Sequence, residues 1–219
     1  METLTILFQN KLSFNEIPFF RGALLHSLPS NENTLLHNHI ESGYRYSYPL
    51  IQYKSIDGKA ALVCINEGID SVMKLMSKDE LTVRIGKKSP QQLSVRHIVP
   101  LPAPITIDSR FIKYDIQRWI PFNSDNYSTY KAIECLSDRI LFLEKLLTAN
   151  ILSLLKGIGI HLNQNIECRL LTISKRDYTE MKGIKVMTLD ASFQTQVSLP
   201  DNIGLGKHVS LGFGNITRK

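Results

Sequence analysis

The chain has 219 residues, of which 43% are apolar, and 26 Lys and Arg against 20 Asp and Glu give a net charge of +6. This length suits one large domain or two small ones with proper cores, and the moderate positive excess favours a polyanionic partner without requiring one. Three scattered cysteines argue against a disulfide framework. No apolar run has the length of a membrane span, and the first residues lack the basic region of a signal peptide. We therefore expect a cytoplasmic protein without membrane contact.

The first hundred residues predict a ferredoxin-like order of elements: strand, helix, strand, strand, helix, strand, with one extra hairpin strand. Asp57-Gly58 is a hairpin turn signal between two of the strands, and alternating or helical spacing of apolar residues marks the other elements. The predicted strands cover residues 4–9, 46–54, 59–65, 81–85 and 93–97, and the predicted helices cover 18–28 and 69–76.

Prolines at 100, 102 and 104 then mark a boundary near residue 103. Beyond it we expect a long strand over 105–119, a long helix over 138–156 that Gly157 ends, strands over 167–174 and 183–198, and a last strand after a Gly-rich loop. The fold class is therefore α+β: two tandem ferredoxin-like βαββαβ domains, residues 1–102 and 103–219. The second domain has a reduced second helix.

The Gly-rich loop near the C-terminus is the most informative segment. Two Gly-x-Gly pairs, Gly204/Gly206 and Gly212/Gly214, flank Lys207 and His208. Bare backbone can approach an anion closely, and the charge suits a nucleic acid backbone. A plain Gly-rich hairpin with a strand over 209–216 explains the spacing equally well. The spacing excludes the usual dinucleotide and triphosphate loops.

This loop at the end of a duplicated ferredoxin-like chain resembles the CRISPR-associated endoribonucleases that cut precursor CRISPR RNA within its repeats, the sixth Cas family of the RAMP superfamily. Two N-terminal segments add to the resemblance: Arg21-Gly-Ala-Leu-Leu-His26, and Leu36-His37-Asn-His39 followed by Tyr44-Arg-Tyr-Ser-Tyr-Pro-Leu-Ile-Gln-Tyr-Lys54. The residues of these two segments look most like those of a b-type branch of that family.

The resemblance implies metal-independent cleavage without a cofactor, by attack of the 2′-hydroxyl on the phosphorus, giving a 2′,3′-cyclic phosphate and a 5′-hydroxyl. It implies that His37 is the principal catalytic histidine. His26, off the buried face of the first helix, is the candidate second member of the proton pair, and Arg45 is the candidate cation for the phosphorane. For each of these residues the alternative is an ordinary surface side chain. We interpret His39 as a rival to His37 rather than as a metal ligand, and we discount Lys54 because it lies at the far end of its strand.

The expected RNA-binding residues comprise the Gly-rich loop and one basic pair at a predicted hairpin tip: Gly204, Gly206, Lys207, His208, Gly212, Gly214, Lys175 and Arg176. The expected partner is CRISPR repeat RNA, and the resemblance leaves room for a homodimer or a CRISPR effector complex. The main alternative is a non-catalytic subunit that holds guide RNA in an effector complex. A ferredoxin-like interaction protein with no RNA role is a third hypothesis, which the Gly-rich loop disfavours.

Overall fold

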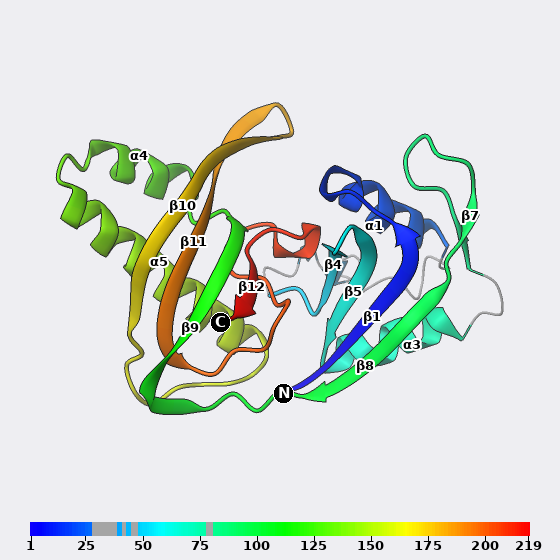
Figure 1. Cartoon of the computed structure of the whole chain (residues 1–219), viewed down its shortest axis with the longest axis horizontal. Helices are drawn as coiled ribbons and strands as arrows, with labels where there is room; N and C mark the ends of the chain where they lie inside the picture. Colours follow the sequence, from blue (N-terminus) through cyan, green and yellow to red (C-terminus); the bar gives the residue numbers. More distant parts are fainter. Residues whose placement is uncertain (28–38, 41–42, 45–47, 78–80) are drawn as a thin grey trace. The chain divides into compact units, whose positions relative to one another are not determined.

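The computed structural model describes residues 1–27, 39–40, 43–44, 48–77 and 81–219 (Figure 1). The chain forms two compact units, which are described separately below. The first unit consists of Met1–Ala103 with Ser210–Gly212, and the second consists of Pro104–Val209 with Phe213–Lys219.

The first unit is built on an antiparallel sheet in the order β4-β5-β1-β8. Two helices, α1 and α3, connect its strands (Figure 1). The four strands are β1 (Glu2–Lys11), β4 (Ile51–Ile56), β5 (Lys59–Ile65) and β8 (Val95–Pro102). The helices are η1 (Phe14–Glu16), α1 (Ile17–His26) and α3 (Glu67–Met76). Two short pairs complete the unit: β2 (His39–Ile40) with β3 (Gly43–Tyr44), and β6 (Thr82–Val83) with β7 (Gln91–Gln92).

The core of this unit follows from the spacing of its apolar residues. Alternate residues of β1 and one face of α1 are buried together, as two-residue and helical periods require. The Phe20 ring lies 6.0 Å from both Phe8 and Tyr53 in edge-to-face contacts, so it joins the helix to two strands. The predicted hairpin turn is present, with φ values of 50° at Asp57 and 72° at Gly58.

Strand β8 is an edge of this sheet and runs through prolines that we expected to end it. Leu4 pairs with Pro100 and Glu2 pairs with Pro102 across the β1–β8 ladder. The N–H of Ala103 donates to Met1 O at 3.0 Å, so alternate residues of β8 face β1 and the two prolines face away from the sheet. All eight residues of β8 are exposed, which is consistent with an edge position.

The second unit has the equivalent sheet order, β10-β11-β9-β12, and all its ladders are antiparallel. Its strands are β9 (Ile107–Trp119), β10 (Cys168–Met181), β11 (Ile184–Val197) and β12 (Asn215–Arg218). Its helices are α4 (Ser124–Ala132), α5 (Leu136–Gly157) and the single turn η2 (Val209–Leu211). The apolar residues Leu143, Leu147, Ile151 and Leu154 share one face of α5 and are buried. Two ferredoxin-like sheets with helices confirm the predicted fold class.

Other elements also differ from expectation. Helix α4 was not predicted, because its polar sequence lacks an apolar stripe. The alternation over 81–85 correctly predicts burial of Leu81, Val83 and Ile85, yet only Thr82–Val83 pairs as a strand. The last predicted strand begins at Asn215 instead of residue 209, because a turn of 3₁₀ helix precedes it. No helix in the described part of the chain is both long and apolar enough to cross a membrane.

The fold predicts a sharp contrast between two adjacent aromatic residues of α1. Phe20 is fully buried, whereas 56% of the Phe19 surface is exposed. We expect Phe20→Ala to lower the free energy of unfolding by about 3–5 kcal/mol, because it removes a ring from a packed core. The matched Phe19→Ala change should cost less than about 1.5 kcal/mol. Denaturant titrations followed by circular dichroism measure both, and equal losses would contradict the packing described.

Candidate nucleic-acid interface

The Gly-rich loop is fastened to the end of strand β9 by backbone hydrogen bonds. Lys207 N–H donates to Ile120 O at 3.0 Å, and Gly214 N–H donates to Arg118 O at 3.2 Å. Within the loop, Leu205 N–H donates to Gly214 O at 2.9 Å. These three amides are therefore used inside the protein, and the loop has a defined shape without a ligand.

Close backbone contacts explain why the loop needs glycine. A Cβ on Gly214, whose φ is +64°, would lie 1.8 Å from Leu205 O. A Cβ on Gly206, whose φ is +94°, would lie 2.7 Å from Ile120 O. Gly204 has its own limit, since a Cβ there would lie 2.5 Å from the Cβ of Val209. These three glycines are thus required by the packing of the loop itself, while their predicted contact with RNA stays a prediction.

Lys207 and His208 are the two polar residues of the Gly-rich loop that we expected to bind RNA. Lys207 and His208 are both exposed, and the His208 ring lies 6.4 Å from the Phe213 ring. Partial burial, followed by the positive charges of Lys207 and Lys182, lowers the pKa of His208 below its ordinary value. The same positive surroundings favour an anion, and an anion bound here would raise that pKa again.

Arg118 is the main addition that the structure makes to the loop. Its guanidinium lies 5.6 Å from the centre of the Phe213 ring, and its backbone has a φ of 51°, in the left-handed region. Burial lowers the pKa of Arg118, while the carboxylates of Asp177 and Asp190 act in the opposite direction. Sequence alone does not distinguish Arg118 from other basic residues on strands, because its place beside the loop depends on the fold.

We expected the basic pair Lys175 and Arg176 at a hairpin tip, and this prediction is wrong. Strand β10 continues to Met181, and the turn falls at Lys182–Gly183. The pair therefore lies in the middle of an exposed edge strand. Lys175 Nζ forms an ion pair with Asp177 Oδ2 at 2.8 Å, and Arg176 Nη2 donates to Tyr130 Oη at 3.3 Å.

The predicted catalytic residues are only partly described. His26 is the last residue of α1 and is exposed. His37 and Arg45 lie outside the described residues, so their predicted roles stay predictions. His39 belongs to β2, where it pairs with Tyr44. Within the described ranges, no three His, Cys, Asp or Glu side chains gather as ligands of a metal ion would.

Lys54, which we discounted from sequence, is the most unusual ionisable group of the first unit. It lies on β4 with 1% of its surface exposed, and its Nζ has no hydrogen-bond partner among the described residues. Burial lowers the pKa of its ammonium to about 7. The neighbouring Gln52 on the same face is also buried, but its Nε2 donates to Tyr48 Oη at 2.7 Å. Local sequence gives no signal of this difference.

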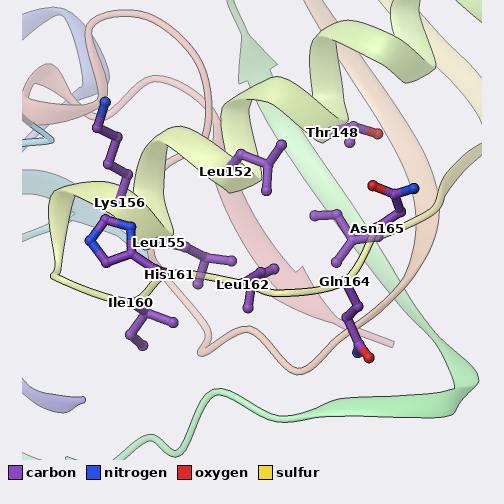
Figure 2. Close-up of a pocket in the computed structure, with 10 residues that line it drawn as sticks. Thr148, Leu152, Leu155, Lys156, Ile160, His161, Leu162, Gln164 and Asn165 are labelled. Carbon is purple, nitrogen blue, oxygen red and sulfur yellow. The ribbon is translucent and has the colours of Figure 1, made fainter.

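A pocket of about 410 Å³ lies along the C-terminal half of α5 in the second unit (Figure 2). Leu152, Leu155 and Leu162 are apolar lining residues. Figure 2 shows the imidazole of His161 at one end and the side-chain amides of Gln164 and Asn165 at the other. The lining residues are Thr148, Leu152, Leu155, Lys156, Ile160, His161, Leu162, Gln164, Asn165 and Ile166. They include none of the predicted site residues that the structure describes, so the pocket is separate from the Gly-rich loop.

The chain consists of two ferredoxin-like units, and the second has a glycine loop in place of its second helix. This is the duplicated ferredoxin-like fold of RAMP proteins. Comparison with family descriptions specifies the branch. Residues 1–99 match the Cas6b N-terminal domain and residues 106–219 match the Cas6b C-terminal domain. The chain belongs to the Cas6b family.

Solved structures share the fold of this chain. A crystal structure of Cas6b has a TM-score of 0.86 at 22% identity, and one of a CRISPR RNA processing endoribonuclease Cas6b has a TM-score of 0.72 at 22% identity. Both matches cover 100% of this chain and 100% of the solved chain. An uncharacterized protein of Methanocaldococcus jannaschii is 32% identical over 114 residues, which is 51% of this chain and 76% of that protein.

Two glycines with positive φ provide a matched test of the close contact in the loop. Gly214 has Leu205 O at its Cβ position, whereas Gly183, with a φ of +79°, has nothing within 4 Å. We expect Gly183→Ala to cost about 1–2 kcal/mol from backbone strain alone. Gly214→Ala should cost at least about 2 kcal/mol more, because the backbone must shift as well. Thermal unfolding of both variants checks this, and similar losses would rule out the contact.

Lys54 predicts a stabilising substitution. Because its pKa falls from about 10.4 in an unfolded chain to about 7 in the folded protein, the folded state carries the full cost of a buried charge below pH 7. That cost decreases as the pH rises from 7 towards 10. We expect Lys54→Met to raise the free energy of unfolding by about 2–5 kcal/mol at pH 6 and by much less at pH 9.5.

The matched control for this prediction is Lys59→Met, at a partly exposed lysine of the same hairpin. It should change the free energy of unfolding by less than about 0.5 kcal/mol at either pH. Denaturant titrations at the two pH values measure both variants. A loss of stability in Lys54→Met at pH 6 would show that the ammonium has a stabilising partner.

Proposed function

We propose that this protein is an endoribonuclease that cleaves precursor CRISPR RNA within its repeats. The observation that carries the proposal is the glycine loop fastened to the end of β9 in a chain that belongs to the Cas6b family. One similar solved structure is described as a CRISPR RNA processing endoribonuclease, which supports the same activity here.

The proposed reaction needs no metal ion. The 2′-hydroxyl upstream of the cut attacks the phosphorus, the bond to the 5′-oxygen breaks, and the products carry a 2′,3′-cyclic phosphate and a 5′-hydroxyl. One group must take the 2′-proton, another must protonate the leaving oxygen, and a cation must stabilise the phosphorane. We assign the proton transfers to His37 and His26 without ordering them, and the electrostatic role to Arg45.

Binding and chemistry are assigned to different parts of the chain. Residues 1–102 carry the catalytic candidates, and residues 103–219 hold RNA. In the second part, Lys207, His208, Lys175 and Arg176 supply charge to phosphates, and the exposed Lys182 beside His208 is added to them. The homodimer and the effector complex implied by the resemblance stay predictions; light scattering of the purified protein tests the first.

Cleavage of repeat RNA in EDTA tests the function. We expect the unaltered protein to cut a synthetic repeat RNA at one position and to leave a 5′-hydroxyl. Direct labelling of the product by polynucleotide kinase, without prior phosphatase treatment, and mass spectrometry detect this end. A single 2′-deoxy substitution at the mapped position should abolish the cut, because it removes the nucleophile. His37→Ala should lower the rate at least about 100-fold.

His97→Ala is the matched control, because His97 is an exposed histidine of β8 with only a structural role expected. Its cleavage rate should stay within about twofold of the unaltered protein. Cleavage of the deoxy RNA, or full activity of His37→Ala, would overturn the mechanism. Tight binding of the repeat without any cleavage would instead favour the non-catalytic guide-RNA subunit.

A further inference from the structure

A group of aromatic and basic side chains gathers where α4 and the start of α5 meet strand β10 in the second unit. We call it the aromatic–cation cluster, and its members are Tyr127, Tyr130, Lys131, Arg139, Arg176 and Tyr178. None of the catalytic or loop assignments above uses it, apart from Arg176. Figure 1 shows α4 beside the upper part of the β10–β11 hairpin, and the bond between Arg176 and Tyr130 joins the two elements.

Buried rings give the cluster a rigid base. Tyr130 and Phe122 are buried, with ring centres 4.8 Å apart, and the Tyr127 ring lies 5.6 Å from Phe122. Tyr178 is different, because 52% of its surface is exposed. The nearby phenol of Tyr127 raises the pKa of Tyr178, so the exposed ring lies beside this base.

Cations lie directly against these rings. Lys131 Nζ is 5.0 Å from the centre of the Tyr127 ring, and Arg139 Cζ is 5.6 Å from that of Tyr130. Arg139 Nε also donates to Ile133 O at 2.7 Å, which fixes its orientation. Lys131 and Arg176 are exposed, and neither forms an ion pair with a carboxylate in the part of the chain that the structure describes.

This combination fits single-stranded nucleic acid better than a protein helix or strand. Bases stack on exposed aromatic faces whatever their sequence, and nearby Lys and Arg hold the backbone phosphates. Helix α4 presents Ser, Thr, Asn and Tyr without an aliphatic stripe, so it offers little to an apolar partner helix. Three of the six members are cations, and the carboxylate between Arg176 and Tyr178, that of Asp177, is already paired with Lys175.

We propose that the aromatic–cation cluster is a stacking site for unpaired RNA, in which Tyr178 stacks on a base while Lys131 and Arg176 hold the adjacent phosphates. The proposal rests on the proposed function for the identity of the RNA. It adds a second contact region, on a helix that sequence patterns did not reveal, to the Gly-rich loop. Tyr127, Tyr130 and Arg139 act as positioning residues.

The ring of Tyr178 provides the first arm of the test. Binding is measured with a fluorescent repeat RNA that carries a 2′-deoxy nucleotide at the mapped cut position, or with all-ribose repeat RNA if no cut is found. We expect Tyr178→Ala to weaken binding about tenfold and Tyr178→Phe to stay within about twofold, because the ring alone can stack. An RNA duplex of the same length should show no difference among these proteins.

The cations and a surface control complete the test. In the double variant Lys131→Gln/Arg176→Gln, the slope of the logarithm of the binding constant against the logarithm of the salt concentration should become shallower by about one to two. Loss of packing alone would not change this slope. Ile184→Ala removes an apolar side chain that is 66% exposed on the same hairpin and should leave RNA affinity unchanged. Circular dichroism melts confirm that each variant is folded.

Two results would overturn the stacking site: unchanged affinity in Tyr178→Ala, or an equal loss in Tyr178→Phe. Unchanged affinity together with a change of oligomeric state in Tyr178→Ala would assign the surface to a protein partner. Cleavage by each protein is measured on all-ribose RNA in parallel. Absence of cleavage in the unaltered protein, with the Tyr178 effect still present, would remove the proposed chemistry and leave the stacking site standing.

Discussion

The C-terminal loop of this protein depends on the close approach of the Leu205 carbonyl to the Gly214 backbone. No side chain fits at that position, so the loop can return to the end of β9 only because a glycine occupies it. The return lets Lys207 and Gly214 donate to the carbonyls of Ile120 and Arg118. The loop then occupies the place in the chain where the first unit has a full helix, and its charged residues are held at the end of the sheet.

A comparable constraint operates in the first unit, where residues of the two N-terminal family-like segments contact one another. Arg21 of the first segment lies 6.0 Å from the ring centre of Tyr53 in the second, and Phe20 packs on the same ring. Gln52 bonds to Tyr48 within the second segment. Part of the resemblance that identified the family therefore reflects packing rather than chemistry. Lys54 is the exception, because its burial costs stability and no described contact offsets that cost.

Much of the fold could be predicted because its signals are local. Alternation in β1, the Asp57-Gly58 turn and the apolar stripe of α5 each follow from residues a few positions apart. Helix α4 was missed because its polar residues give no periodic signal. The prolines do mark the boundary between the two units near residue 103, but β8 was predicted to end before them, whereas an edge strand tolerates prolines.

The site was harder to predict, because its geometry joins distant residues. The sequence showed that the loop was basic and rich in glycine, but it could not show that Arg118 lies against Phe213, or that Tyr130 meets Arg176 across separate elements. Nor could it distinguish the buried Lys54 from the partly exposed Lys59, since burial is set by the packing of the whole unit. The predicted roles of His37 and Arg45 depended on the resemblance alone.

The prolines of β8 have a consequence for how this protein behaves at high concentration. An open sheet edge invites a strand from another molecule, and Ile98, Val99 and Leu101 make this edge unusually apolar. Pro100 and Pro102 face outward, however, and neither can donate to an approaching carbonyl. A strand of another molecule that paired with β8 would therefore lack two successive backbone N–H donors, at Pro100 and Pro102. The strand can thus keep an apolar surface while resisting the open-ended stacking of sheets that leads to aggregation.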